Sequence, residues 1–476
     1  MDIENILPNL EKARKRSKKM IDEISFVLKD EYKNIGLNQK YIIHTYGCQG
    51  NEADSEMMSG ILNNIGYTKI DDEKKADLII INTCAVRETA EDKIWGVVGR
   101  LKNLKEKNPN LIIAISGCMP QEEVVVKKIL EKYKHIDIIF GTHNIFSLPK
   151  LIYEVKTYHK RVIEVFSEEG DIYENIPIER ELKHKAWVTI MYGCDEFCTY
   201  CIIPYTRGKE RSRRPNRIID EVKDLVSKGY KEVTLLGQNV NAYGKDFKDI
   251  DYTFGDLLRD LDKTGIKRIR FTTSHPRDLD DKTISCFKDC KSVMPHLHLP
   301  VQSGSNNILK KMNRKYTKEI YLEKISKLKE ARPDISITTD IIVGFPNETE
   351  EDFLETIDLV KKADFEGAFT FIYSPRVGTP AANFDDNISM EIKKERLQTL
   401  NKYVNQGYLK GNKRFLNETL EVLVDSESKK NQGYLRGYTK NNKLVNFKGD
   451  KKLIGELVNV KITDVKTWFL NGEINE

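Results

Sequence analysis

Short, continuous apolar runs recur in the first third of the chain, and a longer stretch with helical periodicity follows each of them. The runs are YIIHT (41–45), DLIIIN (77–82) and LIIAIS (111–116). Unbroken apolar runs of this length are typical of strands that are buried on both faces of a parallel sheet. The pattern predicts an α/β domain built of βα units over residues 39–157.

A second series of strand and helix patterns fills residues 180–410. Its six apolar runs are WVTIMY, EVTLLGQ, RIRFTTS, HLHLPVQ, ISITTDIIVGF and GAFTFIYS. Six βα units are too few for the usual closed barrel of eight strands, so a partial, open (β/α)6 barrel is expected. Over residues 413–476 the period falls to two, with Gly, Asn and Asp between the runs, which predicts a small β-barrel. Residues 1–38 are highly charged and are expected to form a helical extension.

Composition narrows the class of protein. The chain has 476 residues, a formal net charge of +5 and eight cysteines. No apolar run reaches the roughly 20 residues that cross a bilayer, and the charged N-terminus does not resemble a secretion signal. We therefore expect a cytoplasmic protein that does not associate with a membrane. Thiols are kept reduced there, so the cysteines are metal ligands, catalytic thiols or core residues rather than disulfides.

Three of the cysteines, Cys194, Cys198 and Cys201, lie in one loop after the first strand of the second series. A structural zinc site would require a fourth Cys or His, and the nearest histidine, His184, lies well upstream. A [4Fe–4S] cluster can be held by three thiolates, which leaves one iron open to bind a ligand. A zinc site that borrows a distant ligand is the less favoured alternative.

The spacing CxxxCxxC, with an aromatic residue before the last cysteine, resembles the radical S-adenosylmethionine superfamily. The resemblance implies that the three thiolates hold a cluster whose open iron binds S-adenosylmethionine and cleaves it to a 5′-deoxyadenosyl radical. It also implies cofactor contacts at the ends of later strands, of which the segments 302–304 and 344–346 are equally typical of an ordinary turn. The expected cofactor-binding residues are Gly237, Gln238, Asn239, Gln302, Ser303 and Gly344.

The cysteines Cys48, Cys84 and Cys118 share one local setting, although they are far apart in the chain. Each follows a predicted buried strand and precedes a predicted helix. Because equivalent ends of parallel strands meet at one edge of a sheet, the three thiols can converge there. Helix N-termini also favour the thiolate, which is the form that binds metal. Any one of them alone would more often be a core residue, but the three together predict a second cluster with an open iron.

An N-terminal domain with three cysteines, a radical S-adenosylmethionine barrel and a small β domain together resemble the methylthiotransferases. The resemblance covers the chain from residue 40 to its end. It implies two [4Fe–4S] clusters and S-adenosylmethionine, which acts both as methyl donor and as radical source. In that family the N-terminal cluster supplies the sulfur. Gly50 stands where the family usually has Met, and we expect little consequence because Gly50 is not a proposed ligand.

The segments TYGCQ, ADSE, GCDEFCTYCIIPYTRGKERSR and NNKLVNF resemble the branch that acts on tRNA. That branch adds the methylthio group at C2 of N6-(dimethylallyl)adenosine at position 37. Two related activities are alternatives, one on threonylcarbamoyl-adenosine in tRNA and one on an aspartate of a ribosomal protein. A non-catalytic iron–sulfur protein that binds RNA is an alternative from another class. The resemblance implies a tRNA anticodon stem-loop and a flavodoxin- or ferredoxin-like reducing protein as partners, and nothing requires more than a monomer.

Two basic segments are candidates for RNA contacts. Residues 206–217 follow the radical loop directly, and residues 429–452 place cations between aromatic residues in a segment that resembles the RNA-binding TRAM domain. A charge run is more often only a solvated face, but cations with aromatics on a small β-barrel are typical of binding to looped RNA. The tRNA-acting branch usually has Arg in place of Tyr438. The expected RNA-binding residues are Arg207, Arg211, Arg213, Arg214, Tyr438, Lys440, Lys443 and Phe447.

Two further pairs are interpreted as structural. Cys286 and Cys290 are four residues apart on a predicted helix, and two half-buried small residues are more common there than a metal site. His296 and His298 alternate on a predicted strand with no cluster of carboxylates near them in sequence.

Overall fold

The computed structural model describes the chain except for residues 1–22, 86–87, 168–169, 429–431 and 476. The described residues form two compact units. The first unit comprises the described residues up to Glu181 with Met191–Phe197 and Cys201–Arg213. The second comprises Leu182–Ile190, Cys198–Tyr200 and Arg214–Glu476.

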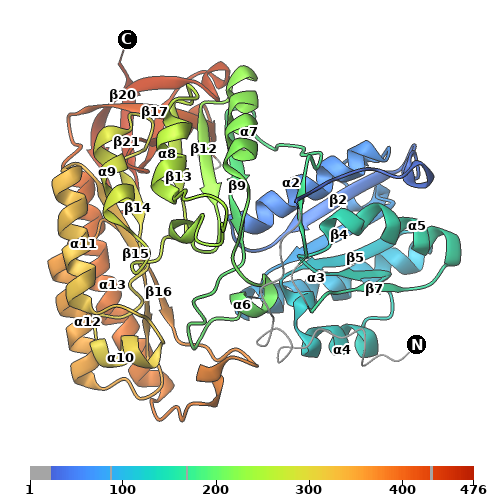
Figure 1. Cartoon of the computed structure of the whole chain (residues 1–476), viewed down its shortest axis with the longest axis horizontal. Coiled ribbons are helices and arrows are strands. Elements are labelled where there is room, and N and C mark those ends of the chain that lie inside the picture. The colour runs from blue at the N-terminus through green and yellow to red at the C-terminus, as the bar shows by residue number, and fades with distance from the viewer. Residues whose placement is uncertain (1–22, 86–87, 168–169, 429–431, 476) are drawn as a thin grey trace. The chain divides into compact units, whose positions relative to one another are not determined.

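The first unit contains a parallel sheet of six strands with helices on both faces (Figure 1). In sheet order the strands are β3 (Thr68–Lys69), β2 (Lys40–Thr45), β4 (Leu78–Thr83), β5 (Ile112–Gly117), β6 (Ile138–Phe140) and β7 (Val162–Glu164). The long helices are α2 (Gln49–Asn64), α3 (Glu88–Lys107), α4 (Glu123–Lys132) and α5 (Leu148–Tyr158). Short 3-10 turns are η3 (Glu73–Lys75), η4 (Met119–Gln121) and η5 (Ile145–Ser147).

Two hydrophobic cores explain why the strands lack polar alternation. Ile79 and Ile81 of β4 pack with α3 and α4 on one face, whereas Leu78 and Ile80 pack with α2 and α5 on the other. Successive side chains of a strand point to opposite faces, so a strand buried on both faces requires apolar residues throughout. The predicted strands and their continuous apolar character are therefore confirmed.

Smaller elements complete the first unit. The strand β1 (Glu23–Ser25) pairs in parallel with β8 (Ile172–Glu174), and β10 (Met191–Tyr192) pairs antiparallel with β11 (Arg211–Ser212). Within 23–38 the structure has β1 and the 3-10 turn η2 (Asp30–Tyr32), so the expected helix is wrong there. The reason is tertiary, because β1 finds a partner strand about 150 residues away. The rest of the expected extension, residues 1–22, lies outside the described residues.

The second unit contains the predicted partial barrel. Six parallel strands form two sheets of three, β9–β12–β13 and β14–β15–β16, and a bridge from Ile269 to Val293 continues the order between them. The strands are β9 (Lys185–Thr189), β12 (Glu232–Leu236), β13 (Arg268–Phe271), β14 (His296–His298), β15 (Ser336–Val343) and β16 (Ala368–Ile372).

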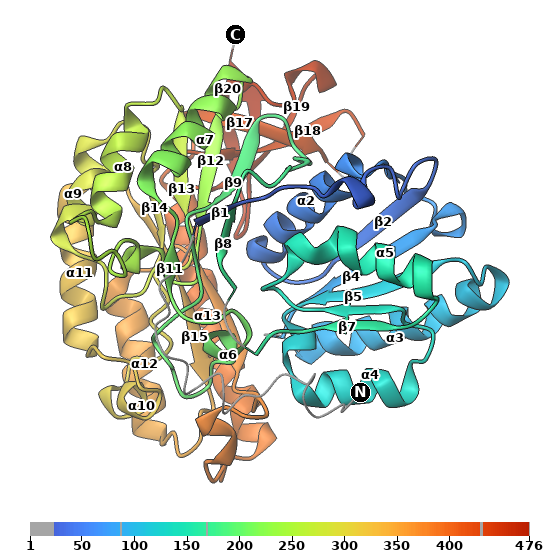
Figure 2. The ribbon, with the colours of Figure 1, turned by 45° about the vertical axis from the view of Figure 1, so that its right-hand side comes forward.

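Helices alternate with these strands and cover their outer side (Figure 2). They are α7 (Pro215–Ser227), α8 (Phe254–Asp262), α9 (Asp281–Asp289), α10 (Asn306–Lys311), α11 (Lys318–Ala331), α12 (Glu350–Ala363) and α13 (Met390–Lys413). The 3-10 turns η6 (Val240–Ala242) and η7 (Pro380–Asn383) lie in loops that follow strands. The alternation of strand and helix brings the carboxyl ends of the strands to one rim, where barrel enzymes place their active sites.

The last part of the second unit is a closed β-barrel of five strands in the order β17–β18–β19–β21–β20. The strands are β17 (Thr419–Glu427), β18 (Tyr434–Thr439), β19 (Leu444–Lys448), β20 (Leu457–Val465) and β21 (Leu470–Ile474), with the turn η8 (Lys451–Leu453) before β20. Closure removes exposed strand edges, and apolar side chains of alternate positions fill the interior. The predicted three-part α/β architecture is confirmed. No helix of the described chain is long and apolar enough to cross a membrane.

Candidate active site

The first cysteine trio lies where three neighbouring strands of the first unit end. Cys48 follows β2 and is the N-cap residue of α2, Cys84 follows β4, and Cys118 follows β5 and is the N-cap residue of η4. Cys84 and Cys118 are each 2% exposed, whereas Cys48 is exposed. The predicted placement of all three thiols at one edge of the sheet is what the structure shows.

Two glycines allow these strand ends to approach one another. Gly47 has φ +133°, and a Cβ added to it would lie 2.7 Å from the Cβ of Cys84. Gly117 has φ +98°, and an added Cβ would lie 2.2 Å from the carbonyl oxygen of Thr83. Any other residue would be strained at these φ values and would also clash.

A buried amide network holds the first turn of α2 against the end of β4. The Nδ2 of Asn51 donates to Asn82 Oδ1 at 3.1 Å and to the carbonyl of Thr83 at 2.8 Å, and Asn82 Nδ2 donates back to the carbonyl of Asn51 at 2.8 Å. The amide of Cys118 donates to the carbonyl of Thr83 at 2.9 Å, which ties the third strand end to the second. The network fixes the backbone that carries each of the three thiols.

The segment after the radical loop closes over this trio. Ile202 and Tyr205, on either side of the start of the short helix α6 (Ile203–Thr206), pack with Ala85 and Cys118 in one buried apolar cluster. Arg207 follows α6 and is 8% exposed. Its Nη2 donates to Asp54 Oδ2 at 2.7 Å, and Asp54 lies on α2 six residues after Cys48.

The thiol of Cys118 lies in a strongly desolvated environment. Burial raises the pKa of Cys118 to about 12, the neighbouring thiols Cys84 and Cys48 add to that rise, and Arg207 opposes it. Without a metal, Cys118 is therefore a neutral thiol at any physiological pH, and metal binding must displace its proton.

The residues present fit a three-thiolate iron–sulfur cluster. The chemistry of the donor set is three sulfur ligands at one edge of a sheet. The Nε of the buried Arg207 has no hydrogen-bond partner among the described residues, and this donor lies in the same electrostatic neighbourhood as Cys48 and Cys118. A cluster with a net negative charge would supply both the metal for the thiols and an acceptor for that donor.

Gly50 also lies in this neighbourhood. A Cβ added to Gly50 would lie 3.5 Å from Cys48 Sγ and 3.8 Å from Cζ of Arg207, which are ordinary contact distances. The position where the resemblance expects Met is therefore adjacent to a proposed ligand, although Gly50 itself contributes no donor atom.

The second trio lies in one loop whose parts belong to different units. The amide of Cys194 donates to the carbonyl of Gly208 at 3.0 Å within the first unit. Cys198 and Thr199 belong to the second unit, where Thr199 donates through its amide to Met312 O at 3.1 Å and through its hydroxyl to Lys311 O at 2.9 Å. Each part of the loop is thus held by hydrogen bonds that the spacing of the cysteines did not predict.

A buried arginine contacts the central cysteine of this loop. Arg314, which follows α10, donates from Nη1 to Cys198 Sγ at 3.3 Å, from Nη2 to the carbonyl of Pro300 at 3.1 Å and from Nε to Tyr316 Oη at 2.9 Å. Sequence reasoning missed Arg314, because its signal is a contact across 116 positions in the chain. A sulfur atom that accepts from a guanidinium fits a thiolate ligand better than a neutral thiol.

The expected cofactor-binding residues lie where the resemblance placed them, after β12, β14 and β15. Asn239 is 1% exposed, and its Nδ2 donates to Asp278 Oδ2 at 2.7 Å. Its Oδ1 has no hydrogen-bond partner among the described residues and is available to accept from a ligand. Gly237 and Gln238, which precede it, are half-buried.

The segments that follow β14 and β15 have unusual backbone conformations and different hydrogen bonds. Gln302 has φ +69°, a left-handed conformation that is strained for a residue with a side chain and that is found more often at functional sites. Ser303 is fully buried and accepts from the amide of Ser305, so its hydroxyl holds the turn rather than pointing outward. Gly344 has φ +67°, and its amide donates to Glu348 Oε2 at 2.8 Å.

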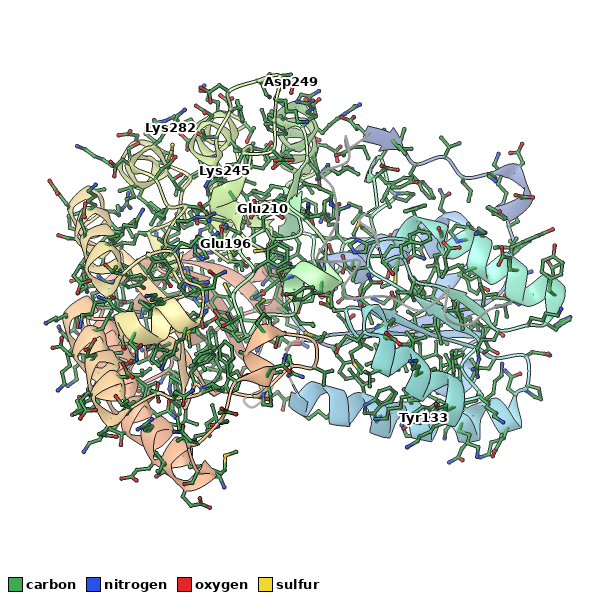
Figure 3. The ribbon with its side chains drawn as sticks, turned by 60° about the horizontal axis from the view of Figure 1, so that its bottom comes forward. Tyr133, Glu196, Glu210, Lys245, Asp249 and Lys282 are labelled. Carbon is green, nitrogen blue, oxygen red and sulfur yellow. The ribbon has the colours of Figure 1, made fainter. Side chains whose placement is uncertain are left out.

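A cavity of about 620 Å³ lies beside Asn239 in the second unit. Its lining includes Lys245 and Asp249, which come from the loop that follows β12 and are labelled in Figure 3, together with Arg277 and Asp278. Burial alone would raise the pKa of Asp278, but hydrogen bonds from Arg277, Lys245 and Asn239 outweigh burial and lower it. Asp278 is therefore a permanent anion that orients the cations of the cavity.

Three of the expected RNA contacts from residues 206–217 point into protein. Arg207 pairs with Asp54, Arg211 is 5% exposed and donates to the carbonyl of Gly170, and Arg213 forms a bidentate pair with Glu174 at 2.7 and 2.6 Å. The expectation that these side chains bind RNA is wrong, because acidic or carbonyl partners far away in sequence neutralise or occupy them. Arg214 remains partly exposed and pairs with Asp249.

Two of the expected contacts on the small barrel are also wrong. Phe447 is fully buried in the barrel core. Lys443 is 8% exposed and pairs with Glu366 at 2.9 Å, and the adjacent Asn441 donates to the carbonyl of Asp334. The turn in NNKLVNF therefore docks the small barrel onto the partial barrel.

The outward positions of β18 and β19 carry exposed aromatic and basic side chains. Tyr434 is 40% exposed and lies directly opposite the exposed Lys448 in the antiparallel pair, and Tyr438 is on the same face of β18. Lys440 is exposed in the following turn. The period of two in the sequence could have separated the inward Phe447 from the outward Tyr434 and Lys448.

Models of three known families match three separate segments of the chain. A model of the radical SAM superfamily matches residues 188–360, and a model of the TRAM domain matches residues 413–474. A third, described as Uncharacterized protein family UPF0004, matches residues 40–141, which contain the first cysteine trio.

Close relatives cover nearly the whole chain. A protein of Bacillus cytotoxicus is 56% identical over 470 residues, which are 98% of this chain and 92% of its own, and one of Geobacillus kaustophilus is 56% identical over 98% of this chain and 88% of its own. Both are named tRNA-2-methylthio-N(6)-dimethylallyladenosine synthase. Among solved structures, the radical S-adenosylmethionine methyltransferase TsrM from Kitasatospora setae is similar in fold, with a TM-score of 0.54, 13% identity and coverage of 73% of this chain and 77% of TsrM.

The partial barrel with its cysteine loop defines the class, a radical S-adenosylmethionine enzyme that contains iron–sulfur clusters. Identity and coverage narrow it further: the chain belongs to the family of the tRNA-2-methylthio-N6-dimethylallyladenosine synthases. The resemblance to the methylthiotransferases, the enzyme class and the cofactors expected from it are thereby confirmed.

Proposed function

We propose that this chain attaches a methylthio group to C2 of N6-(dimethylallyl)adenosine at position 37 of tRNA. Its relatives are named tRNA-2-methylthio-N(6)-dimethylallyladenosine synthase, which supports the modified nucleoside and the tRNA substrate. The observation that carries the proposal is the convergence of Cys48, Cys84 and Cys118 at one edge of the first sheet. A radical generator requires one three-cysteine site. A second such site is expected when the enzyme must also supply sulfur.

The cysteines divide between the two clusters by their setting, three at the ends of parallel strands and three in one loop. Cys48, Cys84 and Cys118 bind the sulfur-donating cluster, and Cys194, Cys198 and Cys201 bind the cluster that engages S-adenosylmethionine. With three thiolate ligands, each cluster offers one iron to a ligand other than the protein.

The rim of the partial barrel binds S-adenosylmethionine in this proposal. The buried Oδ1 of Asn239 accepts a hydrogen bond from the cofactor, and Gly237 lets the backbone approach it closely. Gln238, Gln302 and Gly344 line the same rim, and Ser303 shapes the turn that carries Gln302. Asp278 holds the amide of Asn239 in the orientation that leaves its oxygen free.

The tRNA anticodon stem-loop binds through exposed cations and aromatics of the second unit. Tyr434 and Tyr438 offer flat surfaces for base stacking, and Lys440, Lys448 and Arg214 offer charges for phosphates. Adenine C2 lies inside the stack of the anticodon loop, so the base must leave the stack to react. A flavodoxin- or ferredoxin-like protein supplies the electrons, and a monomer in the cytoplasm suffices.

Replacement of the first trio tests the proposal. The triple variant Cys48→Ala, Cys84→Ala, Cys118→Ala should fall from about eight to about four irons per chain, because each cluster of this type has four irons. It should still produce 5′-deoxyadenosine from S-adenosylmethionine but should leave tRNA without the methylthio group, as measured by mass spectrometry of digested nucleosides.

The matched control is Cys286→Ala with Cys290→Ala, because these cysteines are as buried as Cys84 and Cys118 and are not proposed ligands. It should keep the iron content and the product of the parent protein. Methylthiolation by the triple variant would contradict the role of the first trio.

RNA binding has a separate test. Tyr434→Ala should weaken binding of an anticodon stem-loop by about 1–3 kcal/mol through lost stacking. Lys448→Ala should lower the slope of log K against log salt by roughly 0.7–0.9, the share of one phosphate contact. Lys402→Ala, an exposed lysine on α13, is the control and should change neither. Unchanged affinity and slope in both test variants would contradict this face as the binding surface.

A further inference from the structure

Among the residues that the structure describes, no carboxylate forms an ion pair with Arg314. Arg314 is 8% exposed, and among the described residues its hydrogen bonds go to Cys198, Tyr316 and Pro300, none of which is an acid. By contrast, the buried Arg268 pairs with Glu421 at 2.9 Å and the buried Arg270 pairs with Glu232 at 2.9 Å. A buried cation without an anion is strongly unfavourable, so the position of Arg314 calls for a negative partner.

Neighbouring titratable groups do not supply that partner. Burial first, and then the charge of Arg314, lower the pKa of His275 to about 2, so His275 is neutral. Tyr316 is 5% exposed, accepts from Nε of Arg314 and donates to the carbonyl of Val301 at 2.9 Å. The remaining contact of the guanidinium is Cys198 Sγ.

The geometry of the contact is fixed from three sides. Pro300 and Val301, just beyond β14, accept hydrogen bonds from Arg314 and Tyr316. The guanidinium also lies over the ring of Tyr316, with 5.1 Å from Cζ to the ring centroid. With the plane of the guanidinium held in this way, Nη1 cannot turn away from the sulfur without losing other bonds.

We infer that Arg314 is a positioning residue for the radical-generating cluster, where its guanidinium donates to the Cys198 ligand and supplies the positive charge that makes the cluster easier to reduce. The inference rests on the proposed function, since it takes Cys198 as a cluster ligand. Hydrogen bonds to the ligating sulfurs and a nearby positive charge both stabilise the reduced cluster, which carries one more negative charge. The midpoint potential should therefore depend on the charge of residue 314.

The test uses the full-length chain with Cys48, Cys84 and Cys118 replaced by Ala, so that only the second trio can hold iron. Arg314→Gln removes the charge and Arg314→Lys keeps it. The control Arg268→Gln removes an equally buried guanidinium of the same unit that contacts no cysteine. Iron content and the midpoint potential are measured, the latter by a redox titration followed by electron paramagnetic resonance.

The expected result is a shift to more negative potential in Arg314→Gln with iron content retained, a potential near the parent value in Arg314→Lys, and no shift in Arg268→Gln. An unchanged potential in Arg314→Gln, or equal shifts in the Gln and Lys variants, overturns the inference. If neither variant of Arg314 holds iron while Arg268→Gln does, Arg314 serves folding of the loop and the inference is also overturned. If the parent, in which only the second trio remains, holds no iron, the proposed function itself is refuted. Comparison of the parent with the Arg314 variants distinguishes this outcome from a failure of the inference alone.

Discussion

Cys48, Cys84 and Cys118 come from three strand ends that the chain reaches one after another, whereas Cys194, Cys198 and Cys201 come from a single loop. The first trio exists only when the sheet has formed, because only the parallel register of β2, β4 and β5 brings the thiols to one edge. The second trio is close in sequence before any folding. A substitution that disturbs the sheet should therefore disrupt the first cysteine site. The second site should be disrupted by substitutions within its own loop.

The two regions also differ in how they balance charge. Arg207 beside the first trio is already paired with Asp54, so the arginine and its partner are neutral together. Arg314 beside the second trio has hydrogen-bond acceptors but no acidic partner among the described residues. The first site is thus stable without its cluster, whereas the second depends on its cluster for a counter-charge.

The largest effect is expected from Asp54→Ala. Removal of the carboxylate leaves the buried Arg207 without its anion, and loss of one partner of a buried ion pair costs about 3–5 kcal/mol. Urea unfolding of the iron-free protein measures the change. The double variant Asp54→Ala, Arg207→Met should recover much of the loss, and a loss below about 1 kcal/mol, the range of exposed pairs, would show that Arg207 is solvated.

Gly117→Ala should damage the first cysteine site and leave the second intact. The added Cβ would lie 2.2 Å from Thr83 O at φ +98°, so at least about 2 kcal/mol of strain and a displaced Cys118 are expected. The iron of the first site should be lost, while cleavage of S-adenosylmethionine continues.

Gly229→Ala is the control for this variant, because Gly229 has φ +87° and no atom lies within 4 Å of its added Cβ. It shares the backbone strain but should keep the full iron content. Equal loss of iron in both variants would mean that the φ strain, and not the approach of the strand ends, limits the first site.

Thr199→Val probes the second site with a smaller change. It removes the hydroxyl bond to Lys311 O and leaves the backbone bonds of Thr199 to Met312 and Ala381 in place. We expect a loss of about 1 kcal/mol in the unfolding free energy and no loss of iron. Loss of the second cluster would show that the loop is held by this side chain rather than by its own sequence.

The smallest effect is expected from Gly50→Ala. Gly50 is in the first turn of α2, where Ala is favoured by about 0.5–1 kcal/mol, and the added Cβ makes only ordinary contacts with Cys48 and Arg207. Slightly higher stability at unchanged iron content is the expected outcome, measured by thermal unfolding. Reduced iron content would show that the space beside Cys48 Sγ is needed by the first cluster.

Hydrophobic patterning was sufficient to predict the architecture. Unbroken apolar runs identified strands buried on both faces, six βα units identified the open barrel, and the period of two identified the small β-barrel. The cysteine positions then followed, because a residue just after a buried parallel strand has only one edge of the sheet on which to lie.

Charged residues were predicted less well. The partner of Arg207 lies 153 positions away, and the partners of Lys443 and Arg213 also lie outside the basic runs in which those residues stand. A run of cations predicts only that charge is present. Whether each cation faces solvent or an acid depends on which distant segment packs against it.

By itself, the amino-acid sequence determined which segments form strands and helices and which cysteines follow a strand, because both depend on local periodicity. The tertiary structure alone decided that Arg207 neutralises Asp54, that Arg314 contacts Cys198 and that Phe447 lies in a core. The physical reason is that burial and electrostatic pairing are properties of neighbours in space, and such neighbours can lie far apart along the chain, as Asp54 does from Arg207 and Cys198 from Arg314.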